Sequence, residues 1–213
     1  MNDIFATLLS DPVVLLRNAL RLLHFTGLIL GIGVATMLDL VALRFFFNRR
    51  ISEGAFDIFK FGSSIVGAGI VTIWVSGLGF LLLYLAFEPI KLTNEKVWAK
   101  MVIVLILTIN GAFIHKTILP MLKAQVGKSI FEGRTMTERR TFVLAGTVSV
   151  VSWYAPLIIA SMSALNFRVP ALELLIVYAA VLLIVLAVSN IILAVKFAPT
   201  PARKESKKTH QPA

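Results

Sequence analysis

No cysteine occurs among the 213 residues of this chain. Its absence excludes disulfide bonds, iron–sulfur clusters, thiolate metal sites and palmitoylation. It does not identify a compartment, because a protein without thiols is compatible with both reducing and oxidising surroundings. Acidic residues are also scarce, 11 against 21 lysines and arginines, so the formal net charge is +10.

The first residues lack the pattern of a cleavable signal peptide. Asp3 and Asp11 precede the first apolar run, and that run is longer than a signal sequence needs. No small-residue cleavage pattern follows its first turns. We therefore do not expect this segment to be a cleaved leader.

Apolar residues dominate what is present: 58% of the chain is hydrophobic, and the mean hydropathy is +0.88. Five stretches exceed the roughly 20 residues that a helix needs to cross a bilayer. Strands of a membrane barrel would be about half as long and would alternate in polarity. The sequence therefore predicts an all-α fold, a polytopic membrane helical bundle with five transmembrane helices. The stretches are Leu20–Phe46, Phe61–Phe87, Val97–Leu122, Arg140–Leu165 and Pro170–Phe197.

The two ends of the chain differ from this membrane domain. Residues 1–19 are predicted to be a short outer segment that could hold an interfacial helix. A helix from Pro12 to Phe46 would be about 52 Å long, which exceeds the bilayer, so its first part should lie at the interface or the helix should bend. Residues 198–213 are rich in proline, lysine and serine, which predicts a disordered basic cytoplasmic tail.

Helix starts are marked by capping residues. Asp11 precedes Pro12, a typical helix start with proline at the first helical position. Thr135 and Glu138 have the spacing of a capping box at the start of the fourth helix. Pro170 is expected to begin the fifth.

Basic residues are distributed unequally among the gaps between the stretches. If successive gaps, with the residues that border them, lie on alternating sides of a membrane, one side holds 15 lysines and arginines and the other holds 6. Because lysine and arginine are retained on the cytoplasmic side during insertion, we predict the N-terminus outside and the C-terminus in the cytoplasm. The larger set is Arg44, Arg49, Arg50, Lys60, Lys116, Lys123, Lys128, Arg134, Arg139, Arg140, Lys196, Arg203, Lys204, Lys207 and Lys208; the smaller is Arg17, Arg21, Lys91, Lys96, Lys100 and Arg168.

The same distribution indicates which partners to expect. The basic residues are strung along short loops and a tail beside membrane spans, which suits membrane topology and attraction to anionic lipid. We therefore expect the lipid bilayer as partner, with anionic lipid at the basic loops and tail, and no nucleic acid.

Ionisable side chains at membrane depth are costly, so each is a candidate for function. The first span contributes His24 and Asp39, the third contributes Lys100 and His115, and Asn110 adds an uncharged polar group. His24 lies on a helix face rich in small residues, and Lys100 and His115 share a face of the third span. Small residues let helices approach closely in lipid, so we expect these faces to point into the bundle.

Each candidate also has a structural interpretation. His24 could hydrogen-bond across helices, and Lys100 could extend its ammonium to the interface. His115 could be an interfacial residue near the inner boundary. Asp39 could pair with Arg44 or with His115.

The predicted topology separates the two histidines. At 1.5 Å per residue, His24 lies about 6–9 Å below the outer boundary and His115 roughly 27 Å below it. Two axial nitrogens on one metal lie only about 4 Å apart, so the two cannot share a haem. His24 is instead level with Lys100, and Asp39 is level with His115, which predicts an outer pair and an inner pair.

Parts of the first and third spans resemble a known family. Leu23-His24 at the start of one span and Trp98-Ala99-Lys100 at the start of another, followed by Asn110 and a basic residue before Leu119-Pro120, are similar to the CopD-like copper-resistance membrane proteins. The related HemJ-like protoporphyrinogen oxidases also have the Leu-His pair and a Trp-x-Lys. The resemblance covers about two spans and implies a multi-pass protein of the bacterial cytoplasmic (inner) membrane. In HemJ-like proteins this histidine and lysine are implicated in binding haem b, which implies that role for His24 and Lys100.

Three functions fit these observations. The first is a multi-pass inner-membrane protein of binding or accessory type, with no enzymatic activity assigned. The second is a haem-b-binding membrane redox protein that uses His24 and Lys100. The third is an ion-coupled transporter with an inner polar site at Asp39, His115 and Asn110.

Overall fold

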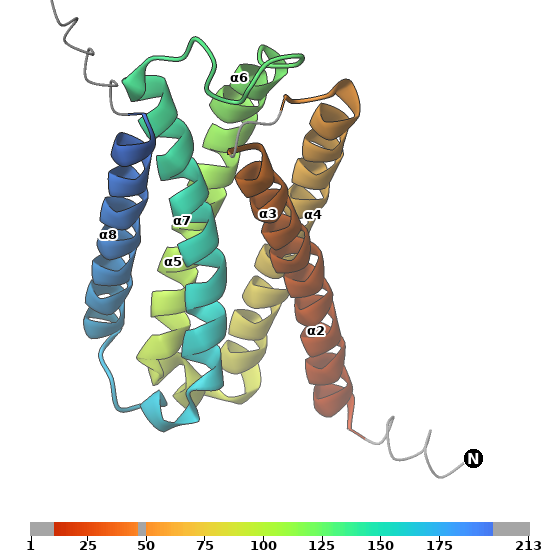
Figure 1. Cartoon of the computed structure of the whole chain (residues 1–213). Helices are drawn as coiled ribbons and strands as arrows, with labels where there is room; N and C mark the ends of the chain where they lie inside the picture. Colours follow the sequence, from red (N-terminus) through yellow and green to blue (C-terminus); the bar gives the residue numbers. More distant parts are fainter. Residues whose placement is uncertain (1–10, 47–49, 198–213) are drawn as a thin grey trace, which may run out of the picture.

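The computed structural model describes residues 11–46 and 50–197, and nearly all of them are helical (Figure 1). No strand forms in these ranges, and five helices in them are long and apolar enough to cross a membrane. The predicted all-helical fold with five such helices is therefore confirmed. The five are Pro12–Phe46 (α2, Pro12–Leu28; η1, Ile29–Gly33; α3, Val34–Phe46), α4 (Glu53–Phe87), Glu95–Lys123 (α5, Glu95–Phe113; η3, Ile114–Ile118; α6, Leu119–Lys123), α7 (Met136–Ser161) and α8 (Ala171–Lys196).

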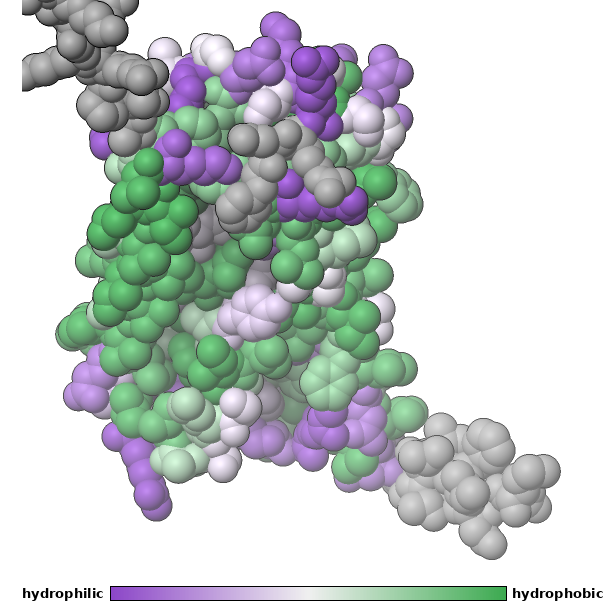
Figure 2. Space-filling view, viewed as in Figure 1, coloured by the Kyte–Doolittle hydropathy of each residue, from purple (hydrophilic) through white to green (hydrophobic). Residues whose placement is uncertain are grey.

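The surface divides into the zones expected of a membrane protein. An apolar band covers the middle of the visible face, and polar side chains gather at its two ends (Figure 2). The chain runs up and down, so the turns joining α4 to α5 and α7 to α8 lie at one end, and the α6–α7 connection lies at the other (Figure 1).

Helix ends follow the predicted capping residues. The Asp11 side chain accepts hydrogen bonds from the backbone N–H groups of Val13 and Val14, and helix α2 begins at Pro12. Thr135 and Glu138 form the reciprocal capping box of α7. Because α2 begins at Pro12, residues 12–19 of the predicted outer segment are continuous with the first membrane helix; its residues 1–10 and the tail at 198–213 lie outside the described residues.

One predicted helix boundary differs from the one in the structure. Helix α7 ends at Ser161, so Ser163–Leu165, which the fourth apolar stretch included, forms a separate short 3-10 helix (η4). Helix α4 ends at Phe87, and Pro89 begins a second 3-10 helix, η2 (Pro89–Thr93).

The first and second membrane helices cross almost backbone to backbone. A Cβ atom on Gly69 of α4 would lie 2.7 Å from the backbone nitrogen of Gly31 and 2.8 Å from its Cα. A Cβ on Gly27 would lie 3.0 Å from the backbone nitrogen of Ile73. This is the close approach that small residues allow between helices in lipid. The π-helical turn Ile29–Gly33 lies at this crossing.

The remaining helices α5, α7 and α8 form a second group. Buried Ala99 and Ile103 of α5 pack with Val151 of α7 and with Leu174 and Tyr178 of α8. Tyr178 also shares a hydrogen bond with Ser152, at 2.8 Å between the two hydroxyl oxygens. The α2–α4 pair and this three-helix group together surround the interior described below.

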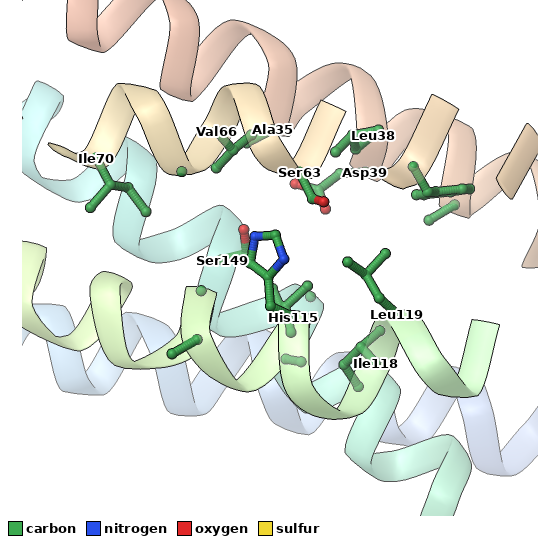
Figure 3. Close-up of a pocket in the computed structure, with 18 of the residues that line it drawn as sticks. Ala35, Leu38, Asp39, Ser63, Val66, Ile70, His115, Ile118, Leu119 and Ser149 are labelled. Atoms are coloured by element: carbon green, nitrogen blue, oxygen red, sulfur yellow. The ribbon is translucent and has the colours of Figure 1, made fainter. Parts of the chain in front are cut away.

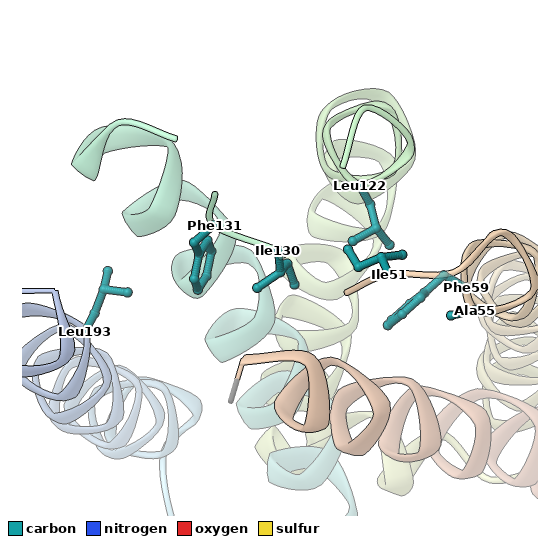
Figure 4. Packing of buried hydrophobic residues seen from close by; sticks show 7 residues of the cluster. All are labelled: Ile51, Ala55, Phe59, Leu122, Ile130, Phe131 and Leu193. Carbon is teal, nitrogen blue, oxygen red and sulfur yellow. The ribbon is translucent and has the colours of Figure 1, made fainter. Parts of the chain in front are cut away.

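One end of the bundle is closed by an apolar cluster that joins both groups (Figure 4). Ile51 and Phe59 pack with Leu122, while Phe131 and Leu193 continue the cluster toward α8. The backbone of Ile51 exchanges hydrogen bonds with the loop after α6, donating to Lys128 and accepting from Gly127. The connection between α6 and α7 therefore packs over this end of the bundle.

An ion-pair group ties α2 to the end of α4. Glu88 contacts the ammonium of Lys91 and the guanidinium of Arg17. The hydrogen bond from Lys91, aided by Arg17, holds the pKa of Glu88 below its ordinary value. The ionised carboxylate therefore stabilises the fold above its unfolded-state pKa, and this contribution is lost as the pH falls through the lower folded-state pKa.

We expect this ion-pair group to affect the pH dependence of the protein's thermal stability. At pH 7 the wild type should melt at a higher temperature than Glu88→Gln, measured for the two purified proteins in the same detergent. The difference should shrink as the pH is lowered below the ordinary carboxyl value of 4.5. An equal difference in melting temperature at every pH would mean that the charge of Glu88 does not contribute to stability.

Candidate functional site

Two cavities lie between the α2–α4 pair and the three-helix group. The first, here called the His24 cavity, has a volume of about 370 Å³. The second, the Asp39 cavity, has a volume of about 300 Å³. Both volumes fall at the lower end of the range of pockets that take drug-sized ligands. The polar and aromatic lining of the His24 cavity includes Arg21, His24, Trp74, Tyr84, Lys100 and Trp153.

The predicted outer pair therefore lines a single cavity. His24 comes from α2 and Lys100 from the first turns of α5, 76 positions later in the chain. The imidazole of His24 lies edge-on to Phe80, with ring centroids 6.0 Å apart. Phe80 in turn stacks on Tyr84, so one wall of the cavity is aromatic.

Ser76 is the hydrogen-bond partner of His24 in this cavity. The Ser76 hydroxyl donates to the carbonyl of Thr72 at 2.7 Å, and a hydroxyl has a single proton to donate. While it donates there, it accepts from His24, whose Nδ1 lies 2.9 Å away; the donor and acceptor roles of this contact depend on the tautomer of the ring. In that arrangement the neutral imidazole carries its proton on Nδ1, and Nε2 keeps its lone pair. A partner that fixes Nδ1–H in this way is typical of histidines that bind metals through Nε2.

Trp153 also lines this cavity, and its indole N–H is a buried donor without a partner in the part of the chain that the structure describes. Its side chain is 3% exposed, and among the described residues none accepts a hydrogen bond from its indole N–H. The indole N–H of Trp74, by contrast, donates to the Thr108 hydroxyl at 3.0 Å. A buried polar group without a partner is costly.

The predicted inner pair lines the Asp39 cavity. Asp39 and Ser63 project from one wall, His115 projects from the opposite wall, and Ser149 lies behind it (Figure 3). Within the described part of the chain, no hydrogen bond or ion pair reaches the Asp39 carboxylate, so the alternative pairs with Arg44 and His115 do not form.

Asn110 does not join this site. It is buried, and its amide donates to the carbonyl of Ala145 at 3.0 Å, tying α5 to α7. Its side chain lies on the face of α5 that packs against α7, and it does not line the Asp39 cavity. The predicted grouping of Asn110 with Asp39 and His115 is therefore corrected: Asn110 is a packing contact.

Several residues of the site were not predicted from the sequence. Ser76 contacts His24 across 52 positions of the chain, and its place among the glycines Gly69, Gly77 and Gly79 of the second span is the only sequence signal for this contact. Trp74 and Trp153 lie within apolar spans, where nothing in the sequence separates them from packing residues, and Arg21 enters the sequence analysis only as part of the charge distribution. Within the described ranges, no group of three or more histidine, aspartate or glutamate side chains could hold a metal ion.

Comparison with known proteins leaves the family open. No family model matches the chain, and no curated protein and no solved structure is significantly similar to it. The resemblance of two spans to CopD-like and HemJ-like proteins stays a prediction.

Proposed function

We propose that this is a multi-pass protein of the bacterial cytoplasmic membrane that binds an amphipathic acid in the His24 cavity. The observation that carries the proposal is the joint presence of His24 and Lys100 in one aromatic-walled cavity. Arg21 adds a second basic side chain to the lining, and among the described residues no carboxylate lines this cavity. A planar or elongated apolar ligand with a carboxylate fits this composition, because the walls suit its body and the two cations suit its charge.

Haem b is the specific candidate for this ligand. The donor set is compatible with it: the Nε2 lone pair of His24 can bind iron, and Lys100 and Arg21 can hold propionates. Haem would supply one-electron redox chemistry to the site. The chain's own residues would hold it, with Ser76 orienting His24. No catalytic residue is assigned, and the proposal is one of binding.

The orientation of the molecule is part of the proposal. The up-and-down helices bring the basic-rich loops and the end of α8 to one end of the bundle, and the turns at 88–94 and 162–170 to the other. Placing the basic end in the cytoplasm makes the His24 cavity the outer one.

Reporter fusions test this orientation. We expect a fusion near residue 130 to be active as a cytoplasmic reporter, and a fusion near residue 92 to be active only as an external one. The reverse pattern would contradict the orientation without affecting the binding proposal.

A visible absorption spectrum tests the haem candidate. The protein is purified in detergent, supplemented with haem and separated from the excess. We expect a Soret band that stays with the protein and shifts on reduction. Metal-free protoporphyrin serves as the control for the acid alone, followed by quenching of tryptophan fluorescence. Binding of the porphyrin without a Soret shift for haem would leave an amphipathic-acid site and reject His24 as an iron ligand; binding of neither would reject the proposal.

A further inference from the structure

The two cavities lie end to end, and little more than one layer of side chains separates them. On α7, Ser149 lines the Asp39 cavity and Ser152 lines the His24 cavity. Three residues along a helix correspond to about 4.5 Å. On α5, Thr108 lines the Asp39 cavity while its neighbour Leu107 lines the His24 cavity.

A buried cluster, here called the septum, fills the space between them. Its members are Ala35, Ile70, Ile73, Leu107 and Trp153. Ala35 and Ile70 also line the Asp39 cavity, whereas Ile73, Leu107 and Trp153 line the His24 cavity. The septum is apolar on both sides and is contributed by four of the five membrane helices.

Trp153 is the largest part of the septum and sits in a notch made by glycine. A Cβ atom on Gly31 would lie 2.1 Å from Cη2 of the indole, so the ring edge rests on the bare backbone of the π-helical turn Ile29–Gly33. Such turns interrupt the regular helix and are frequent at functional sites. Because Trp153 also faces the His24 cavity, that cavity offers space into which the ring can turn.

The charges of the two cavities restrict what could pass between them. The His24 cavity carries Lys100 and Arg21, which would repel a metal cation, and among the described residues no lysine or arginine lines the Asp39 cavity to pair with an anion. A proton is compatible with both, because His24 on one side and Asp39 and His115 on the other can each take it up and release it.

We propose that the two cavities are the halves of one proton passage and that Trp153 is its hydrophobic gate. With the indole in the Gly31 notch, the septum excludes water and the passage is closed. Turning of the ring joins the cavities, and protons move between His24 and the Asp39–His115 site. The inference does not depend on the ligand of the His24 cavity, because its tests use protein to which no ligand has been added.

Proton flux into proteoliposomes tests the gate. With a pH-sensitive dye inside and a potassium diffusion potential across the membrane, the wild type should leak little. Trp153→Ala should raise the flux by about 10-fold or more, because an apolar constriction has been removed, and Trp153→Phe should stay close to the wild type. Adding Asp39→Asn to Trp153→Ala should reduce the flux again. Wild-type flux through monodisperse Trp153→Ala protein would overturn the proposal.

Cysteine accessibility tests the passage without altering the gate. The chain has no cysteine of its own. Gly67 and Gly77 lie on α4, line the Asp39 and His24 cavities respectively, and have open space where a Cβ would stand. We expect Gly67→Cys to react with an impermeant thiol reagent from one side of the membrane only, and Gly77→Cys from the opposite side only. Ile191→Cys, on the exposed surface of α8, is the unreactive control.

The outcomes of this test are distinct. Reaction of both cysteines from the same side, or of neither from either side, would overturn the passage, even where Trp153→Ala fails to fold. In protein that also carries Trp153→Ala, each cysteine should become reactive from the far side as well. Failure of haem binding would leave these results unaffected.

Discussion

Replacing Gly69 with alanine is expected to lower the free energy of unfolding by about 3 kcal/mol, the upper end of the usual range for an overpacked site. The added methyl would lie 2.7 Å from the backbone nitrogen and 2.8 Å from the Cα of Gly31. Backbone atoms cannot rotate away as a side chain can, so α2 and α4 must separate along their crossing. The measurement is the unfolding transition of the purified protein in mixed micelles.

Gly67→Ala is the matched control for this prediction. Gly67 lies on the same helix, and a Cβ there meets no atom within 4 Å. Alanine is favoured over glycine in a helix by about 1 kcal/mol, so this variant should be as stable as the wild type or more stable. Equal stability of the Gly69→Ala and Gly67→Ala proteins would show that the two helices do not cross at Gly69.

Replacing His24 with alanine is expected to weaken haem binding by about 100-fold or more, since loss of a residue that only orients a metal ligand already costs 10–100-fold. Ser76→Ala should therefore weaken binding by about 10-fold, because His24 would lose the partner that fixes its Nδ1 proton. Lys100→Met should cost about 10-fold through the loss of a charged hydrogen bond to a carboxylate. The measurement is a titration followed by the Soret band.

His115→Ala provides the internal control. His115 lines the Asp39 cavity and not the His24 cavity. Its replacement should leave haem affinity unchanged, whereas an equal loss on replacing either histidine would contradict the assignment of the ligand to the His24 cavity.

Much of the fold could be predicted from the sequence because it depends on local patterns. Spans of more than 20 apolar residues require helices, since only helices satisfy their backbone hydrogen bonds internally in lipid. Asp11 and the Thr135–Glu138 capping box marked two helix starts for the same local reason. The start of the first helix, eight residues before its apolar stretch, is set by Asp11 and not by hydrophobicity.

The site could be predicted only in part, because its details depend on packing between distant helices. Helix direction and depth grouped His24 with Lys100 and Asp39 with His115, and each group lines one cavity. Depth says nothing about rotation around the helix axis, however, and Asn110 faces α7 instead of the Asp39 cavity for that reason.

The role of Trp153 is a further feature that could not be predicted from the sequence. The residue lies within a predominantly apolar span, so nothing local distinguishes it from an ordinary packing residue. Its importance follows from Gly31, which is 122 positions away in the sequence. Because Gly31 has no side chain, the indole fits against its backbone. Only the tertiary structure brings the two together.

A structure of the protein with haem added tests the central claim most directly, that the His24 cavity binds an amphipathic acid through His24 and Lys100. The account predicts ligand density between α2, α4 and α5, with iron bound to Nε2 of His24 and a propionate beside Lys100. Density in the Asp39 cavity with an empty His24 cavity, or haem bound only on the outer surface of the bundle, would contradict it.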